Sequence, residues 1–232
     1  MKKYKHILFD LDHTLWDFDK NSTETLHELY DKYEFKNYEK FTHDMFVDKF
    51  MEVNTYLWHL YDSNKIDRIY LRKERFKLVL TALGVEEQHV PPEIGEVYLS
   101  ICPTKPHVVT YAYEILEYLK DKGYGMHVVT NGFQDVQDIK LISSNLKDYF
   151  DHIITSETAG HKKPNPDFFE YTLNLIGSPR EECIMVGDNP DTDIKGALNF
   201  DLDVIFFNPR LRPHDFKVTY EITALEEIKN IL

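Results

Sequence analysis

The fold is decided by the run His6-Ile7-Leu8-Phe9-Asp10-Leu11-Asp12-His13-Thr14-Leu15, at residues 6–15. Its apolar, partly β-branched first half is typical of a central strand of a parallel sheet. Open α/β sheets bind their ligands at the carboxyl ends of such strands, so Asp10 and Asp12 are predicted to lie in a reactive site. Two carboxylates this close repel each other, and a hard divalent cation with oxygen ligands would relieve the repulsion.

The Asp-x-Asp spacing is weak evidence by itself, because it recurs at 17–19, 191–193 and 201–203. Most such pairs are solvated charges in turns. The pair at Asp10 and Asp12 differs because an apolar strand precedes it and no Gly, Pro or Asn directly follows it to mark a surface turn. This context predicts a functional site at the pair.

The composition describes a soluble globular protein of 232 residues, 42% of them apolar, enough for one large domain or two modest ones. A formal net charge of -13 argues against a nucleic-acid polymer or a membrane as partner, so a bound phosphate would need local cations or a metal. The apolar run near the start breaks at Asp10, too early for a signal peptide or a spanning helix, and a cytoplasmic protein is predicted. Cys102 and Cys183 belong to no metal or redox motif, so both are predicted to be reduced and structural.

Strands alternate with helices in the second half of the chain. Short apolar strands are predicted at 126–130, 152–155, 183–186 and 204–207. Together with the first strand these make five, and the alternation implies parallel pairing with right-handed crossovers. We therefore predict an α/β fold with a three-layer, doubly wound, Rossmann-like parallel sheet.

A helical stretch interrupts this pattern between the first and second strands. Its helices are predicted at 23–33, from Glu39 to about Leu60, and at 67–83. Because residues 16–97 contain no convincing strand, we predict that they form a separate α-helical cap. The α/β core then consists of residues 1–15 and 98–232.

Two other strand ends carry groups that suit an anion. Thr130-Asn131-Gly132 offers a hydroxyl, an amide and an unencumbered backbone for phosphate oxygens, with an ordinary turn and helix cap as the alternative. After the third strand, Pro164 holds Lys163 in an extended conformation, so Lys163 is the predicted active-site cation. A solvated lysine pair is the alternative there.

The fourth strand ends in acidic residues. Asp188 follows Gly187 directly and is the predicted metal partner of Asp10. Asp193 is predicted either to bind the metal, directly or through water, or to orient its ligands, and Asp191 is read as a charge at a helix N-terminus. Helix capping would explain any one of these acids taken alone.

The strand-end motifs together resemble those of the haloacid dehalogenase-like phosphatases. The match lies at residues 10–14, Thr130, Lys163 and 187–193, in the same order and with a helical cap after the first motif. The resemblance covers essentially the whole chain. It implies a magnesium-dependent phosphomonoester hydrolase that acts through an aspartyl-phosphate intermediate.

The resemblance also implies a role for each matched residue. Asp10 would be the nucleophile and Asp12 the general acid/base. Magnesium would be bound by Asp10, the backbone carbonyl of Asp12 and Asp188, with Asp193 as a further candidate ligand. The groups that would hold the phosphoryl group are Thr130, Asn131, Gly132 and Lys163. Of these, Thr130 and Lys163 would be catalytic together with the acidic pair.

The closest resemblance is to the pyrimidine nucleotide 5'-phosphatases that act on non-canonical nucleotides. The stretches that carry it are residues 12–18, Asn54 with Leu57-Trp58, Arg75-Phe76, Ser156-Glu157, 207–209 and 220–222. They imply that the partner is a small phosphorylated metabolite, a pyrimidine nucleoside 5'-monophosphate. Trp16, Phe18 and Trp58 would offer a face for the base, with core packing as the alternative.

Several other functions would use the same core. A sugar-phosphate or phosphoglycolate phosphatase and a phosphomutase share its motifs, whereas a haloalkanoate dehalogenase would not need Asp12 and Asp188. The non-enzyme alternative is a phospho-accepting receiver module, which places its acceptor on a middle strand and needs no large cap. The oligomeric state is left open by the sequence.

Overall fold

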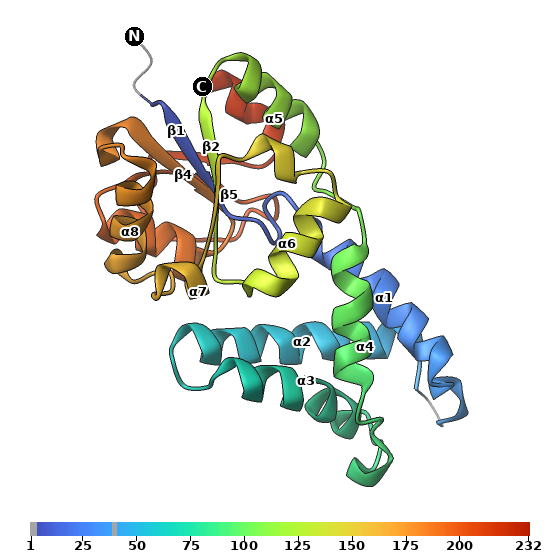
Figure 1. Ribbon diagram of the computed structural model, residues 1–232. Coiled ribbons are helices and arrows are strands. Elements are labelled where there is room, and N and C mark those ends of the chain that lie inside the picture. The colour runs from blue at the N-terminus through green and yellow to red at the C-terminus, as the bar shows by residue number, and fades with distance from the viewer. Residues whose placement is uncertain (1–3, 39–40) are drawn as a thin grey trace. The chain divides into compact units, whose positions relative to one another are not determined.

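The computed structural model describes residues 4–38 and 41–232. This part of the chain divides into two compact units (Figure 1). One unit contains the described residues up to Phe18 together with Pro106–Leu232, and it is an α/β core. The other unit is Asp19–Lys105 and is helical. No helix in the described ranges has both the length and the apolar character that a membrane span needs.

The core unit is built on a six-stranded sheet with the order β3-β2-β1-β4-β5-β6. Its strands are β1 (His6–Phe9), β2 (Gly125–Thr130), β3 (His152–Thr155), β4 (Cys183–Gly187), β5 (Asp203–Phe207) and β6 (Tyr220–Ile222). All neighbouring strands pair in parallel. The predicted doubly wound α/β fold is therefore confirmed, and β1 lies at its centre between β2 and β4. The edge strand β6 was not predicted.

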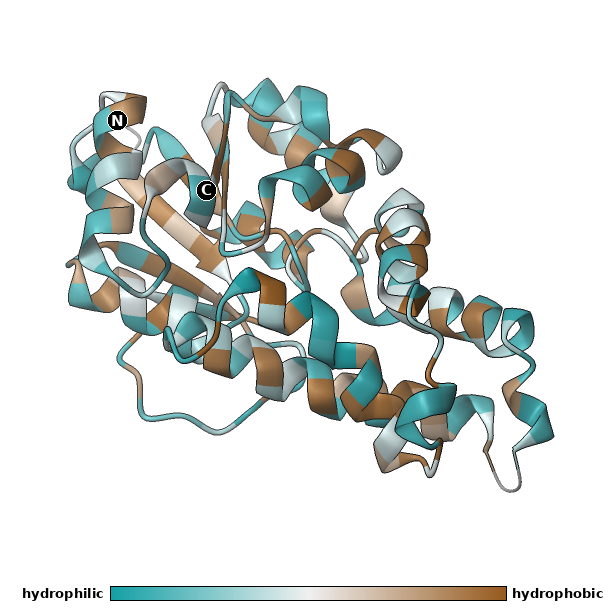
Figure 2. Ribbon diagram, turned by 60° about the horizontal axis from the view of Figure 1, so that its bottom comes forward, coloured by the Kyte–Doolittle hydropathy of each residue, from teal (hydrophilic) through white to brown (hydrophobic). Residues whose placement is uncertain are grey.

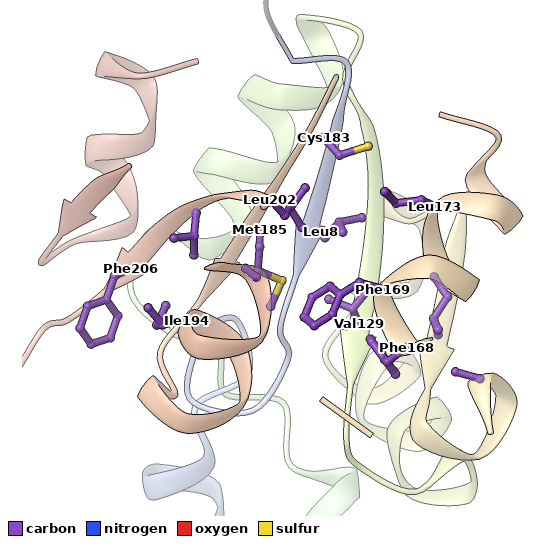
Figure 3. Packing of buried hydrophobic residues seen from close by; sticks show 14 residues of the cluster. Leu8, Val129, Phe168, Phe169, Leu173, Cys183, Met185, Ile194, Leu202 and Phe206 are labelled. Atoms are coloured by element: carbon purple, nitrogen blue, oxygen red, sulfur yellow. The ribbon is translucent and has the colours of Figure 1, made fainter. Parts of the chain in front are cut away.

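Helices cover both faces of this sheet (Figure 1). They are α5 (Ala112–Asp121), α6 (Gln134–Ser143), α7 (Ser156–Ala159), α8 (Pro166–Ile176) and α9 (Lys195–Asn199). One hydrophobic layer joins the strands to α8, where Leu8, Val129 and Met185 lie with Phe168 and Phe169 (Figure 3). These side chains are fully buried, so the strand ends that carry the polar motifs project from a close-packed base.

The described residues of the helical unit form four α-helices, which show the alternation of polar and apolar residues expected of amphipathic helices (Figure 2). They are α1 (Phe18–Lys32), α2 (His43–Asp62), α3 (Arg68–Ala82) and α4 (Ile94–Ile101). The hydroxyl of Thr42 caps α2 and the carboxylate of Asp67 caps α3, each by accepting from a backbone N–H three residues on. The Glu39 start expected for the second helix lies outside the described residues.

The helical unit ends later than the boundary expected at residue 97. The reason is α4, which was not predicted and runs through that position. Its Tyr98 is buried, with its ring centroid 5.0 Å from that of Phe50 in α2 and 5.3 Å from that of Phe76 in α3. These aromatic contacts attach α4 to the helical unit, which extends to Lys105.

Three histidines stack across β1, β2 and β3. The ring centroid of His127 lies 5.3 Å from those of His6 and His152, and His127 is only 1% exposed. Burial lowers the pKa of His127 to about 3, and the neighbouring His6 and His152 act in the same direction. The buried imidazole is therefore neutral throughout the physiological range.

This buried histidine should weaken the fold in acid. Below about pH 6.5 the unfolded chain binds a proton at His127, whereas the folded protein does not bind this proton until about pH 3. The free energy of unfolding therefore falls as the pH falls through this window. Between pH 7 and pH 5 the loss is about 2 kcal/mol. The free energy of unfolding, measured in urea, should not show this loss in a His127→Gln variant. The control His161→Gln, which changes an exposed histidine, should show the same loss as the wild type. If the free energy of unfolding falls with pH equally in the wild type and in His127→Gln, the lowered pKa assigned to His127 is wrong.

Candidate active site

The carboxyl ends of β1 and β4 bring three of the predicted acidic residues together. Asp10 follows β1 and is fixed there by its backbone N–H, which donates to the carbonyl of Val186 at 2.9 Å. Asp188 follows β4, and Asp193 lies in the short helical turn η6 (Pro190–Ile194). Among the described residues, Asp10, Asp188 and Asp193 form the acidic cluster, each offering a carboxylate oxygen within 4.8 Å of the others. Hard oxygen donors of this kind suit a divalent cation.

Lys163, the predicted active-site cation, lies inside this cluster. Its Nζ donates at 2.7 Å to Asp10 Oδ1, to Asp193 Oδ1 and to the backbone carbonyl of Val129, and the residue is 1% exposed. Burial acts to lower the pKa of Lys163, but the two carboxylates outweigh it and raise that pKa above its ordinary value. Burial raises the pKa of Asp10 despite the opposing ammonium. The three acidic groups of the cluster thus carry more negative charge than this one lysine offsets.

Asn131 fixes the loop that carries Lys163. Its Nδ2 donates to the backbone carbonyl of Lys163 at 2.9 Å, and its Oδ1 accepts from the backbone N–H of Lys163 at 2.8 Å. The side chain that was predicted to contact phosphate therefore spans two loops and positions the lysine.

Gly187 makes room for Asp193. A Cβ at position 187 would collide with the Asp193 carboxylate, so the absence of a side chain lets that acid turn back toward the strand end. Asp193 is fully buried, and its Oδ2 accepts from the backbone N–H of Asn189 at 3.1 Å. Asp191 is exposed and has no place in the acidic cluster.

Asp188 has a partner that sequence reasoning missed. Nη2 of Arg212 donates to its carboxylate at 3.3 Å and to its backbone carbonyl at 3.1 Å. Burial raises the pKa of Asp188 to about 6, although Arg212 opposes the shift. Asn208, at the end of β5, orients this arginine by bonding its backbone N–H and carbonyl. The Asn directly after the predicted strand at 204–207 is a sequence feature of this loop, but it does not identify Arg212 as the partner of Asp188.

Asp12 lies apart from the three acids. Its Oδ1 accepts from Lys140 Nζ at 2.5 Å, and its Oδ2 accepts from Gln137 Nε2 at 2.9 Å. Burial acts to raise the pKa of Asp12, but the Lys140 ammonium and these hydrogen bonds hold it below its ordinary value. The metal contact predicted for Asp12 involves its backbone carbonyl, not this carboxylate, and it stays a prediction. Sequence reasoning missed both partners, which lie three residues apart on α6, the helix that follows Thr130.

Two of the aromatic residues expected to form a face for a base lie against each other, because the ring centroids of Trp16 and Phe18 are 6.2 Å apart. Trp16 is fully buried, with Lys140 Nζ 4.4 Å from the centroid of its ring, so it offers no open face. Phe18 belongs to the core unit, and Trp58 belongs to the helical unit, where it packs edge-on against Tyr61. Cys102 and Cys183 are both buried, in agreement with the structural role predicted for them.

The chain is similar to known hydrolases in both sequence and structure. Pyrimidine 5'-nucleotidase YjjG from Escherichia coli (strain K12) is 32% identical over 99% of this chain and 98% of the relative. Pyrimidine 5'-nucleotidase PynA from Streptococcus pneumoniae is 29% identical over 99% and 97%. The crystal structure of the HAD-hydrolase YfnB from Bacillus subtilis bound to magnesium superposes with a TM-score of 0.86 at 28% identity, covering 100% of this chain and 99% of that one. The family described as haloacid dehalogenase-like hydrolase matches residues 4–201, and this chain belongs to it.

Proposed function

We propose that this hydrolase is a magnesium-dependent phosphatase that cleaves pyrimidine nucleoside 5'-monophosphates through an aspartyl-phosphate on Asp10. The observation that carries the proposal is the cluster of Asp10, Asp188 and Asp193, in which the buried ammonium of Lys163 pairs with Asp10 and Asp193. Support for the substrate comes from the two relatives named pyrimidine 5'-nucleotidases, which match this chain from end to end.

The residues present fit a magnesium ion. Three carboxylates face two cations, the buried ammonium of Lys163 and the exposed guanidinium of Arg212, and the remaining negative charge is unfavourable unless a further cation or a proton offsets it. Asp10, Asp188 and Asp193 would hold the ion, together with the backbone carbonyl of Asp12. When bound, magnesium offsets the charge of the phosphate as it approaches the attacking carboxylate.

The protein groups then have separate tasks. An Asp10 oxygen forms a bond to phosphorus as the ester P–O bond breaks, and the leaving oxygen takes a proton from the protonated form of Asp12, which is the minor form because Lys140 and Gln137 hold the pKa of this carboxyl low. In the second step, a water molecule loses a proton to Asp12 and displaces the phosphoryl group from Asp10, which releases inorganic phosphate. Lys163 orients Asp10 throughout, and the Thr130 hydroxyl and Gly132 backbone bind phosphoryl oxygens.

Phosphate release from a panel of esters tests the substrate. With magnesium present, uridine and thymidine 5'-monophosphates should give higher kcat/KM than purine monophosphates, phosphoglycolate or hexose phosphates. The preference should appear in kcat/KM because binding of the base helps to orient the phosphate against Asp10. A clear preference for a sugar phosphate or phosphoglycolate would reject the nucleotide assignment and leave the phosphatase assignment intact. Transfer of the phosphoryl group to a second position of the substrate would identify a phosphomutase.

Removal of the metal tests the acidic cluster. Chelation should stop turnover, and Asp188→Asn should weaken magnesium binding at least about 10-fold, since it removes a charged oxygen ligand. Calorimetric titration of the free protein with magnesium measures this without any substrate. Asp191→Asn is the matched control, because Asp191 is exposed and outside the cluster. Full activity of the metal-free enzyme would contradict the proposed metal role.

A further inference from the structure

Two side chains of α6 hold the Asp12 carboxylate, and neither belongs to the four strand-end motifs. Lys140 Nζ donates to Oδ1 at 2.5 Å and Gln137 Nε2 donates to Oδ2 at 2.9 Å. The two residues lie three positions apart and so share one face of the helix. Gln137 is 1% exposed and Lys140 is 6% exposed. A buried amide and a buried ammonium thus occupy both oxygens of one carboxylate.

Gln137 also contacts Thr130. Its Nε2 donates to Thr130 Oγ1 at 3.0 Å, and the same oxygen accepts from the backbone N–H of Gly132 at 3.0 Å. A hydroxyl group has two lone pairs and one proton, so these two bonds leave Thr130 its proton for a further partner. The amide can approach this closely because residue 132 is a glycine. A Cβ at this position would collide with the Gln137 side chain. Thr130 is thereby fixed as a hydrogen-bond donor.

Lys140 is held in place from two sides. Its ammonium lies 4.4 Å from the centroid of the fully buried Trp16 ring, and within the described chain Asp12 is the carboxylate paired with it. A buried charge is stable only when it is paired, and a cation over an aromatic face gains further attraction. The ammonium therefore stays at Asp12 instead of extending into solvent, as surface lysines do.

We infer that Gln137 and Lys140 are positioning residues of the phosphatase reaction, an inference that rests on the proposed function. Both aim the Asp12 carboxyl at the oxygen whose proton it moves. Gln137 in addition turns the Thr130 hydroxyl proton toward the phosphoryl oxygens. Lys140 thus acts on proton transfer alone, whereas Gln137 acts on proton transfer and on phosphate binding.

Lys140→Met tests the first part of this inference. Its kcat for uridine 5'-monophosphate should fall about 10- to 100-fold, a share of what a positioned acid/base contributes. With p-nitrophenyl phosphate, Asp10 bonds to phosphorus while nitrophenolate leaves as an anion without needing a proton. The variant should then release one nitrophenolate per active site in a burst, because only the later hydrolysis needs Asp12. An unchanged kcat would overturn the inference.

A double variant provides the sharper comparison. Adding Lys140→Met to Asp12→Asn should lower kcat little further, since both changes act through the same carboxyl group. Losses that multiply would show that Lys140 acts elsewhere and would overturn its assignment. Lys140→Arg should regain part of the lost kcat because its guanidinium can still donate to Asp12. Lys147→Met, which removes an exposed lysine just beyond α6, should match the wild type.

Gln137→Leu tests the second part through phosphate affinity. The inhibition constant of inorganic phosphate should rise about 10-fold, since the Thr130 hydroxyl is no longer fixed as a donor. The same constant should stay unchanged in Lys140→Met. If thermal unfolding shows that Gln137→Leu does not fold, Gln137→Glu replaces it, because its carboxylate keeps the size and cannot donate. Unaltered phosphate affinity in a folded Gln137 variant would overturn this part.

Failure of the proposed function and failure of the positioning roles would give different results. A wild-type protein that releases phosphate from no ester in the presence of magnesium would overturn the proposed function. A wild-type phosphatase whose Lys140 and Gln137 variants behave as Lys147→Met does would overturn only the positioning roles.

Discussion

Replacing Asp10 by asparagine is expected to abolish phosphate release, with kcat lower by roughly 10⁴-fold or more. The amide keeps the size of the side chain but is a poor nucleophile and brings no charge to the acidic cluster. The fold should survive, because Lys163 keeps a second carboxylate, Asp193, at 2.7 Å. Phosphate release across the ester panel measures the loss, and circular dichroism verifies the fold. Turnover near the wild-type rate would remove Asp10 from its assigned role.

The matched control for this change is Asp12→Asn. It should leave attack on p-nitrophenyl phosphate intact while slowing the hydrolysis of the phosphoenzyme, so that the covalent intermediate accumulates. Digestion and peptide mapping should then place the phosphate on Asp10. A label on Asp12 or on a histidine would reverse the assignment of the nucleophile.

Replacing Lys163 by methionine should produce the largest loss of stability. The change leaves Asp10 and Asp193 buried without their shared ammonium, and removal of one partner from a buried ion pair costs about 3–5 kcal/mol. Turnover should also be lost, because Asp10 is no longer oriented. Urea unfolding in the absence of metal measures the free energy.

The neighbouring lysine serves as the control for this prediction. Lys162→Met makes the same chemical change at a residue that is only partly buried, and its effect should stay within about 0.5 kcal/mol of the wild type. Equal unfolding free energies for the two variants would show that the buried ion pairs contribute little to the fold.

The strands of the core were predictable because each is a short apolar run followed by a polar motif. Topology then brings the ends of parallel strands to one edge, which is why Asp10 and Asp188 could be placed together before the structure was known. Strand β6 has only three residues, two of them exposed, and therefore carries no apolar pattern. Helix α4 comes soon after Pro91-Pro92 and has only eight residues, and no helix was predicted there.

The partners of the site residues were harder to predict than the motif residues themselves. A lysine or a glutamine on an amphipathic helix is usually solvated, so nothing in the sequence marks Lys140 and Gln137 as buried. Their burial depends on how α6 leaves β2 and on the space beside Gly132. Arg212 reaches Asp188 only through the conformation of the loop after β5. Such contacts depend on side-chain reach across loops, which sequence spacing does not encode.

The central place of β1 in the sheet has a consequence for the synthesis of the chain. Both of its neighbours, β2 and β4, come after the entire helical unit in the sequence. As the chain leaves the ribosome, the apolar strand His6–Phe9 therefore emerges long before any strand that can pair with it, whereas α2 and α3 can pack together at once. We expect the nascent chain to carry a folded helical unit beside an unpaired β1, a candidate binding segment for chaperones until β4 is made.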